Sequence, residues 1–210
     1  MSRMRIIYSI VIVLIMLAGC TPAKTKSNKV LLVLSETSYD MDYMLENEIS
    51  VDVDMLKKAG FEPVLASRTG VVLGTSYKIT PDLKLADVKV EDYVGIMFPC
   101  MATAFIYPYY PEPLRVAQQA AALKKPIAAQ VHGIFTLIEA GVMDGKKYTL
   151  IEELKDTVYA PTSIYMGEGI VQDGNIITSG ICPFMARETD KPDGTKELAQ
   201  KFIDYLKSTP

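Results

Sequence analysis

The chain has 210 residues, of which 49% are hydrophobic, 22 are basic and 25 are acidic, which suffices for one sizeable core and excludes a disordered, collagen-like or cysteine-rich miniature protein. The formal net charge of −3, without any run of lysine and arginine, argues against a nucleic-acid partner. With one histidine, His132, and three cysteines that lack the spacing of a zinc site, the sequence predicts no metal and no cofactor.

The N-terminal segment has the pattern of an export signal. Two arginines precede an apolar run over residues 6–17, which is shorter than the roughly 20 residues that span a bilayer. The run ends in Leu-Ala-Gly-Cys at 17–20, which is similar to the lipobox of prokaryotic lipoproteins. This resemblance implies a signal peptide over 1–19 and acylation of Cys20 by a diacylglyceryl group. The alternative is an ordinary signal, or a short anchor in which Cys20 is incidental.

Residues 20–28 are small and polar and show no periodicity, which is typical of a flexible tether. We therefore expect the chain to be exported and anchored to a lipid bilayer through Cys20. The bilayer would be the outer face of the cytoplasmic membrane or another envelope membrane, and the folded part would remain in water.

From residue 29 onward, strand patterns alternate with helix patterns. The continuous apolar run over 29–34 is typical of a strand buried on both faces of a parallel sheet. The other expected elements are, in chain order, a helix over 48–59, strands over 61–66 and 93–98, a helix over 113–123, a strand over 126–130, a helix over 133–140, a hairpin over 169–178 and a helix over 196–206. The alternation predicts one α/β domain over 29–208, with a doubly wound, mostly parallel sheet and a site at the carboxyl ends of its strands.

Four blocks in this domain carry a family resemblance. They read Asp-Tyr-Val-Gly-Ile-Met-Phe-Pro at 92–99, Lys-Pro-Ile-Ala-Ala-Gln-Val-His-Gly at 125–133, Glu-Ala-Gly-Val-Met-Asp-Gly-Lys-Lys at 139–147 and Val-Gln-Asp-Gly-Asn-Ile-Ile-Thr-Ser at 171–179. Their order resembles the ThiJ/PfpI family of the class I glutamine amidotransferase-like superfamily. The resemblance implies a flavodoxin-like fold with helices on both faces of the sheet, and commonly a homodimer. Because family members include proteases, chaperones, glyoxalases and deglycases, the resemblance selects no reaction.

The sequence departs from the family at the nucleophile. The family motif resembles Ala-Ala-Ile-Cys-His-Gly, whereas residues 128–133 here read Ala-Ala-Gln-Val-His-Gly, so that Val131 occupies the cysteine position. Valine has no lone pair and no ionisable proton, which excludes nucleophilic attack from this position. The family turn strains the backbone of its cysteine, and a β-branched residue tolerates such dihedral angles poorly. We therefore predict a relaxed turn at Val131.

Two residues that support the nucleophile in the family have matches here. Glu48 matches the glutamate that hydrogen-bonds the cysteine, and His132 matches the residue after it. In an apolar pocket, Glu48 would have a raised pKa and could act as an acid or base; alternatively it is an exposed first-turn glutamate favoured by the helix dipole. His132 could take part in general catalysis, but a hydrogen-bonded structural histidine is the interpretation we favour.

Two cysteines replace family residues around the same turn. Pro-Cys-Met at 99–101 replaces the family Pro-Gly-Gly, and Ser-Gly-Ile-Cys-Pro at 179–183 replaces Ser-Arg-Gly-Pro. The resemblance therefore implies that Cys100 and Cys182 meet over Val131. They could form a disulfide that closes a loop of about eighty residues, worth up to roughly 4 kcal/mol. Alternatively one of them is a relocated nucleophile, or both are independent small hydrophobes.

These observations favour a membrane-tethered, extracytoplasmic, non-catalytic binding or scaffold protein. Its pocket would be bounded by Glu48, Met101, Val131, His132 and Cys182 and would take an unknown small ligand or peptide. The aromatic, proline-rich stretch over 105–113 could stack a ligand at the pocket mouth, or serve as a lid or dimer contact.

Two other functions stay open at this point. One is a thiol-dependent hydrolase or reactive-carbonyl detoxifying enzyme that uses Cys100 or Cys182. The other is a chaperone-like stress protein, whose action would need neither thiol.

Overall fold

The computed structural model describes residues 27–102, 110–157 and 159–209. The expected signal peptide, Cys20, nearly all of the tether and positions 105–109 of the aromatic stretch lie outside the described residues. Within the described ranges, none of the helices has both the length and the apolar character that a membrane span needs.

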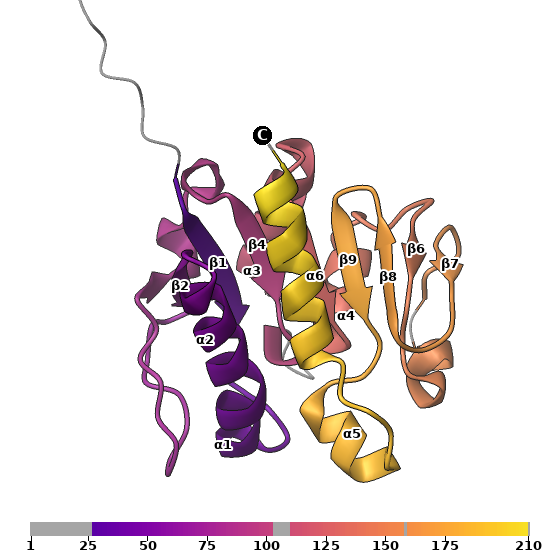
Figure 1. Ribbon diagram of the computed structural model, residues 1–210, viewed down its shortest axis with the longest axis horizontal. Coiled ribbons are helices and arrows are strands. Elements are labelled where there is room, and N and C mark those ends of the chain that lie inside the picture. The colour runs from indigo at the N-terminus through magenta and orange to yellow at the C-terminus, as the bar shows by residue number, and fades with distance from the viewer. Residues whose placement is uncertain (1–26, 103–109, 158, 210) are drawn as a thin grey trace, which may run out of the picture.

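A seven-stranded sheet forms the centre of the molecule (Figure 1). Its strand order is β3-β2-β1-β4-β5-β9-β8, and all neighbouring pairs are parallel except the hairpin of β8 and β9. The strands are β1 (Lys29–Leu34), β2 (Glu62–Ser67), β3 (Leu83–Lys84), β4 (Gly95–Phe98), β5 (Ile127–Gln130), β8 (Ile170–Asp173) and β9 (Ile176–Ser179). A separate parallel pair consists of β6 (Lys147–Tyr148) and β7 (Ile164–Tyr165). The predicted doubly wound, mostly parallel sheet is confirmed.

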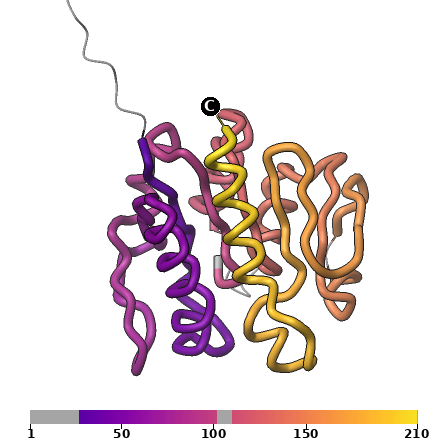
Figure 2. Tube along the Cα trace, in the orientation of Figure 1, coloured from indigo at the N-terminus to yellow at the C-terminus, as the bar shows by residue number. Residues whose placement is uncertain are grey.

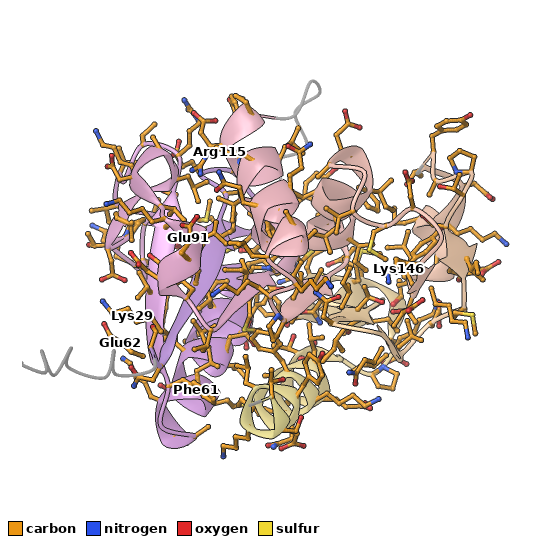
Figure 3. The ribbon with its side chains drawn as sticks, turned by 90° about the horizontal axis from the view of Figure 1, so that it is seen from above. Lys29, Phe61, Glu62, Glu91, Arg115 and Lys146 are labelled. Carbon is orange, nitrogen blue, oxygen red and sulfur yellow. The ribbon has the colours of Figure 1, made fainter. Side chains whose placement is uncertain are left out.

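Helices cover both faces of this sheet. The helices are α1 (Met41–Met44), α2 (Ser50–Lys58), α3 (Pro111–Ala122), α4 (His132–Glu139), α5 (Pro183–Thr189) and α6 (Thr195–Ser208). In Figure 1, α2 and α6 lie in front of the sheet, and α3 and α4 lie behind it. Seen from above in Figure 3, the helix that carries Arg115 lies on one side of the sheet and the yellow α6 lies on the other.

Short helical turns complete the described chain. A π-helical turn, Leu45–Ile49, joins α1 to α2, so that the expected helix over 48–59 is part of a longer helical segment. Turns of 3-10 helix cover Leu85–Asp87, Val90–Asp92, Cys100–Ala102 and Glu152–Thr157. Helix α3 begins at Pro111, two residues before the expected start at 113, because prolines in the first turn of a helix lose no hydrogen bond.

The core follows the apolar strands. All residues of β4, β5 and β9 are buried, as are the residues of β1 after Lys29, which agrees with the prediction from the continuous apolar run. Gly95 of β4 permits α6 to approach closely, because a Cβ atom there would lie 2.7 Å from the ring of Phe202. The two ends of the sheet differ: β1 begins and α6 ends at one end (Figure 2), and the loops that leave the carboxyl ends of β4 and β5 lie at the other.

Candidate functional site

Three chain segments meet at the carboxyl end of the sheet. The 3-10 turn that carries Cys100 follows β4, the turn at Val131 joins β5 to α4, and Cys182 precedes α5. Doubly wound sheets bind their ligands at this end, which makes the junction the candidate site.

Val131 adopts a strained conformation, with φ of 41° and ψ of −101°. The prediction of a relaxed turn is therefore wrong. The surroundings impose the geometry: the Val131 N–H donates to the Ser179 carbonyl at 3.0 Å, and the Val131 carbonyl accepts from the Ile134 N–H at 2.9 Å. Gly133 packs so closely that a Cβ atom would lie 1.9 Å from the carbonyl oxygen of Phe98. The fold thus keeps a sharp strand-to-helix turn, at a cost of about 1–3 kcal/mol, although the side chain at its apex has no reactive atom.

Glu48 lies beneath this junction and is not exposed. The π-helical turn carries it inward, where its side chain is completely buried and its Oε1 accepts from the Cys100 backbone N–H at 2.6 Å. Its Oε2 has no hydrogen-bond partner among the described residues. Burial raises the pKa of Glu48 well above its ordinary value, and the negative charges of Cys182 and Asp52 raise it further. Glu48 therefore keeps its proton at pH values at which an ordinary glutamate has lost it.

The thiols of Cys100 and Cys182 are both free and both buried. The Cys100 thiol donates a hydrogen bond to the Cys182 sulfur. The Cys100 sulfur also lies 3.4 Å from Nδ1 of His132 and accepts from the His132 backbone N–H. The structure therefore places Cys100, His132 and Cys182 together, while the disulfide between the two cysteines stays a prediction.

The two thiols differ in acidity. Burial, the hydrogen bond to Cys182 and the negative charges nearby raise the pKa of Cys100 well above its ordinary value. Burial alone would also raise the pKa of Cys182, but its sulfur accepts from the Cys100 thiol and from the backbone N–H groups of Phe184 and Met185, and its pKa is lowered overall. The pair therefore gives up its first proton from Cys182.

His132 is a neutral imidazole at neutral pH. Burial lowers its pKa to about 4, and its ring packs edge-on against Phe135 with the ring centroids 5.0 Å apart. Since it carries no charge, it influences the Cys100 sulfur through hydrogen bonding alone.

A cavity of about 300 Å³ opens above these thiols. Met101, His132 and Cys182 line it as expected, whereas Glu48 and Val131 do not. The other lining residues are Ser38, Tyr39, Met44, Cys100, Phe135, Leu154, Thr157, Phe184 and Met185. Apart from the two thiols, none of these described residues has a side chain that is charged at neutral pH, so the walls suit a small, neutral molecule. No group of three or more histidine, cysteine, aspartate or glutamate residues within the described ranges is arranged to hold a metal ion.

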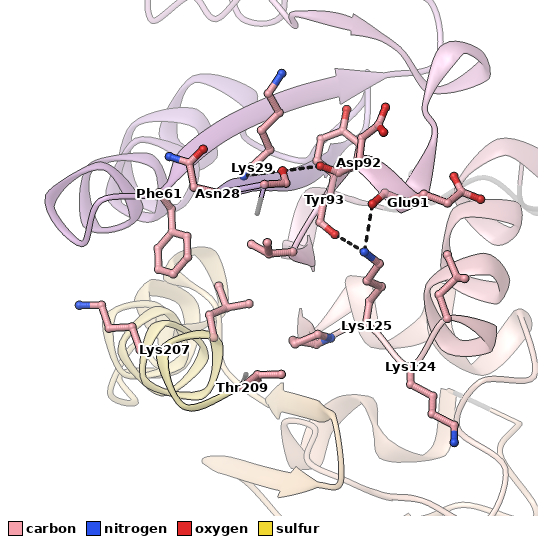
Figure 4. Close-up of a pocket in the computed structure, with 15 residues that line it drawn as sticks. Asn28, Lys29, Phe61, Glu91, Asp92, Tyr93, Lys124, Lys125, Lys207 and Thr209 are labelled. Carbon is pink, nitrogen blue, oxygen red and sulfur yellow. Dashed lines mark hydrogen bonds between the residues drawn. The ribbon is translucent and has the colours of Figure 1, made fainter. Parts of the chain in front are cut away.

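A second hollow, of about 910 Å³, lies at the opposite end of the sheet (Figure 4). Four lysines line it, namely Lys29, Lys124, Lys125 and Lys207. The Lys125 ammonium donates to the carbonyl oxygens of Tyr93 and Glu91 at 2.5 and 3.2 Å, and the Lys29 ammonium lies 3.7 Å from a carboxylate oxygen of Glu62. Sequence reasoning missed this hollow because its walls come from several distant segments that share no motif.

The fold and the sharp turn define a flavodoxin-like α/β protein with a site at the turn after β5. The model of the DJ-1/PfpI family matches residues 28–185, and the chain belongs to this family. An uncharacterized protein from Archaeoglobus fulgidus is 32% identical over 157 residues, which cover 70% of this chain and 86% of that protein. A protein from Pyrococcus abyssi named a deglycase is 25% identical over 152 residues, which cover 71% of this chain and 89% of that protein.

Solved structures show the same fold. The ThiJ/PfpI domain protein from Brachyspira murdochii has a TM-score of 0.70 at 16% identity, and the match covers 88% of this chain and 99% of that one. DJ-1beta from Drosophila melanogaster has a TM-score of 0.59 at 22% identity, with coverage of 88% and 100%. At these identities the likeness concerns the fold alone.

Proposed function

We propose that this chain is a lipid-anchored, extracytoplasmic member of the DJ-1/PfpI family that binds a small, neutral, largely apolar molecule. This binding needs no nucleophile at the sharp turn after β5. The observation that carries this proposal is Val131, which is fully buried at the apex of the sharp turn and has no group that could attack a substrate. The uncharged walls of the cavity support a neutral ligand, and its volume of about 300 Å³ limits that ligand to a small molecule.

The binding proposal predicts that filling the cavity abolishes binding. Met185 lines the cavity from α5, and we expect Met185→Trp to occupy the space of the ligand. Ligand-observed NMR with phenol and indole as neutral probes should show saturation transfer with the unmodified protein and none with this variant. Glu188→Trp places the same ring on the exposed side of α5 and should retain binding. Equal saturation transfer in both variants, or none in the unmodified protein, would contradict the proposal.

The anchoring part of the proposal rests on the sequence of the N-terminal segment and on where the described chain begins. Ser27 lines the lysine-lined hollow, at the end of the sheet opposite the thiols. The seven residues from Thr21 to Ser27 span at most about 25 Å, so an acylated Cys20 would hold this end near the bilayer. Lysines near a membrane surface are attracted to anionic headgroups.

Acylation predicts that Cys20→Ser releases the protein from the membrane. Cells fed an alkyne-labelled fatty acid should label the unmodified chain and not the variant, because the thioether-linked lipid needs the Cys20 sulfur. The variant should also move from the membrane fraction to the soluble fraction. Cys100→Ser serves as the matched control and should keep both the label and the membrane fraction. Unchanged labelling of Cys20→Ser would exclude lipidation at this residue.

A second candidate function, a thiol-dependent enzyme acting on reactive carbonyl compounds, is favoured by one observation. Cys100 lies in the cavity with its sulfur next to both His132 and Cys182, and some relatives are named deglycases. Consumption of methylglyoxal that is lost in both Cys100→Ser and Cys182→Ser, while phenol still binds, would favour this enzyme over the binding protein.

A further inference from the structure

We propose that Cys100 and Cys182 form a reversible dithiol–disulfide pair that exchanges electrons with small, uncharged disulfides and thiols entering the cavity. This redox activity goes beyond ligand binding and does not depend on it. It rests on the arrangement of the two sulfurs, on their unequal exposure and on the groups packed around them.

The two thiols border the same cavity and interact through a hydrogen bond, although 81 residues separate them in the chain. Cys100 is held by the hydrogen bond from its backbone N–H to Glu48, and the next residue is held by the Ser35 N–H, which donates to the Met101 carbonyl at 2.7 Å. Cys182 is held at the start of α5, where its carbonyl accepts from the Ala186 N–H at 2.8 Å. The S–H···S hydrogen bond between the cysteines therefore joins two segments that the fold itself places side by side.

Unequal exposure assigns the two thiols different roles. Cys100 is 7% exposed and Cys182 is 0% exposed, and both border the cavity. Because Cys100 is the residue of the pair that keeps an exposed fraction, we assign its sulfur the first contact with a small molecule from solvent. Cys182 is positioned behind it, where it can attack only a sulfur already attached to Cys100.

The exchange takes two steps. Cys182 first releases its proton to solvent. Cys100 then passes its proton to the Cys182 thiolate along their hydrogen bond, and the Cys100 sulfur attacks the small disulfide, whose S–S bond breaks and whose first thiolate leaves. Cys182 then gives its proton to that thiolate and attacks the Cys100 sulfur, and the second thiolate leaves and takes a proton from solvent. The two cysteines lose two electrons and two protons, and the small disulfide gains both to become two thiols.

The surroundings favour both directions of this exchange. The backbone N–H of His132 stabilises negative charge on the Cys100 sulfur, and the N–H groups of Phe184 and Met185 stabilise it on Cys182. A thiolate that is stabilised in the reduced form makes the disulfide easier to reduce.

The test uses the full chain with Cys20→Ser, so that Cys100 and Cys182 supply all the thiols. Buffers of bis(2-hydroxyethyl) disulfide and 2-mercaptoethanol, which are small and uncharged, are followed by maleimide alkylation and intact mass. We expect both thiols to become inaccessible to maleimide together as the ratio of disulfide to thiol in the buffer rises, and to become reactive again together when that ratio falls. Thiols that stay free at every ratio, a stable adduct on one cysteine, or a bond that 2-mercaptoethanol cannot reduce in the folded protein would each overturn the proposal.

Single substitutions test the assigned roles. Cys182→Ser, with Cys182→Ala as a second variant in case serine perturbs the fold, should stop at a mixed disulfide on Cys100. Cys100→Ser should form no adduct, because Cys182 is not exposed. Dithiodiglycolate, a disulfide of similar length with two negative charges, should react more slowly with the unmodified pair because the cavity walls hold no cation to receive it. An adduct on Cys182 in Cys100→Ser would overturn the order of attack.

Discussion

Replacement of Gly133 by alanine is expected to lower the free energy of unfolding by about 3 kcal/mol or more. A Cβ atom at this position would lie 1.9 Å from the carbonyl oxygen and 2.7 Å from the carbonyl carbon of Phe98. Because both atoms belong to the backbone of β4, no side-chain rotation relieves the clash, and the first turn of α4 or the end of β4 must move. Overpacking of this kind typically costs 1–3 kcal/mol, and more where the backbone is trapped, hence the estimate of about 3 kcal/mol.

Urea unfolding provides the measurement, and Gly141→Ala provides the control. Gly141 has a φ of 71° and no heavy atom within 4 Å of its would-be Cβ, so alanine there costs only about 1 kcal/mol of backbone strain. Gly133→Ala should also weaken the contact between Cys100 and His132, because His132 begins the displaced helix. Equal losses of stability in the two variants would show that the close packing against Phe98 does not hold the turn in place.

Glu48→Gln is expected to stabilise the protein at pH 8 and to leave its stability at pH 4 almost unchanged. The folded-state pKa of Glu48 lies well above the ordinary value of 4.5. Below 4.5 both folded and unfolded chains hold the proton. Above it the unfolded chain releases the proton first, so stability falls by up to about 1.4 kcal/mol for each pH unit until the folded-state pKa is reached. Glutamine keeps the carbonyl oxygen that accepts from Cys100 and cannot ionise.

The measurement is the free energy of unfolding of both proteins between pH 4 and pH 8. Glu46→Gln is the control: Glu46 lies on the same π-helical turn but is exposed, so the variant should follow the pH dependence of the unmodified protein. Asp52, whose pKa burial also raises well above its ordinary value, keeps part of that dependence in every variant. An unchanged pH dependence in Glu48→Gln would mean that Glu48 is ionised in the folded protein.

Much of this architecture could be predicted from the sequence, because short apolar runs typical of strands alternate with helical patterns. The central β1, β4 and β5 and the hairpin of β8 and β9 were found to within one or two residues. The strands β3, β6 and β7 were not, because each has only two residues and contains no periodicity to detect.

The candidate site could be predicted from the sequence only in part. The positions of Glu48, Cys100, His132 and Cys182 were expected together from a family resemblance, since the resemblance fixes which loops share an end of the sheet. The strained conformation of Val131 was not expected, because the prediction considered only the backbone preference of valine itself. Hydrogen bonds to Ser179 and Ile134, together with the contact of Gly133 against β4, override that preference.

The π-helical turn at Leu45–Ile49 is the structural form of a one-residue insertion within a helix. Residues after the insertion keep their alignment with the neighbouring α6, while those before it are rotated by about 100°, the angle that one helical residue subtends. Removal of one residue from this turn would therefore leave the packing of α2 intact and turn α1 about the helix axis. Length variation at this place would alter the wall of the cavity that Met44 supplies and the inward position of Glu48, while α2 keeps its packing against α6.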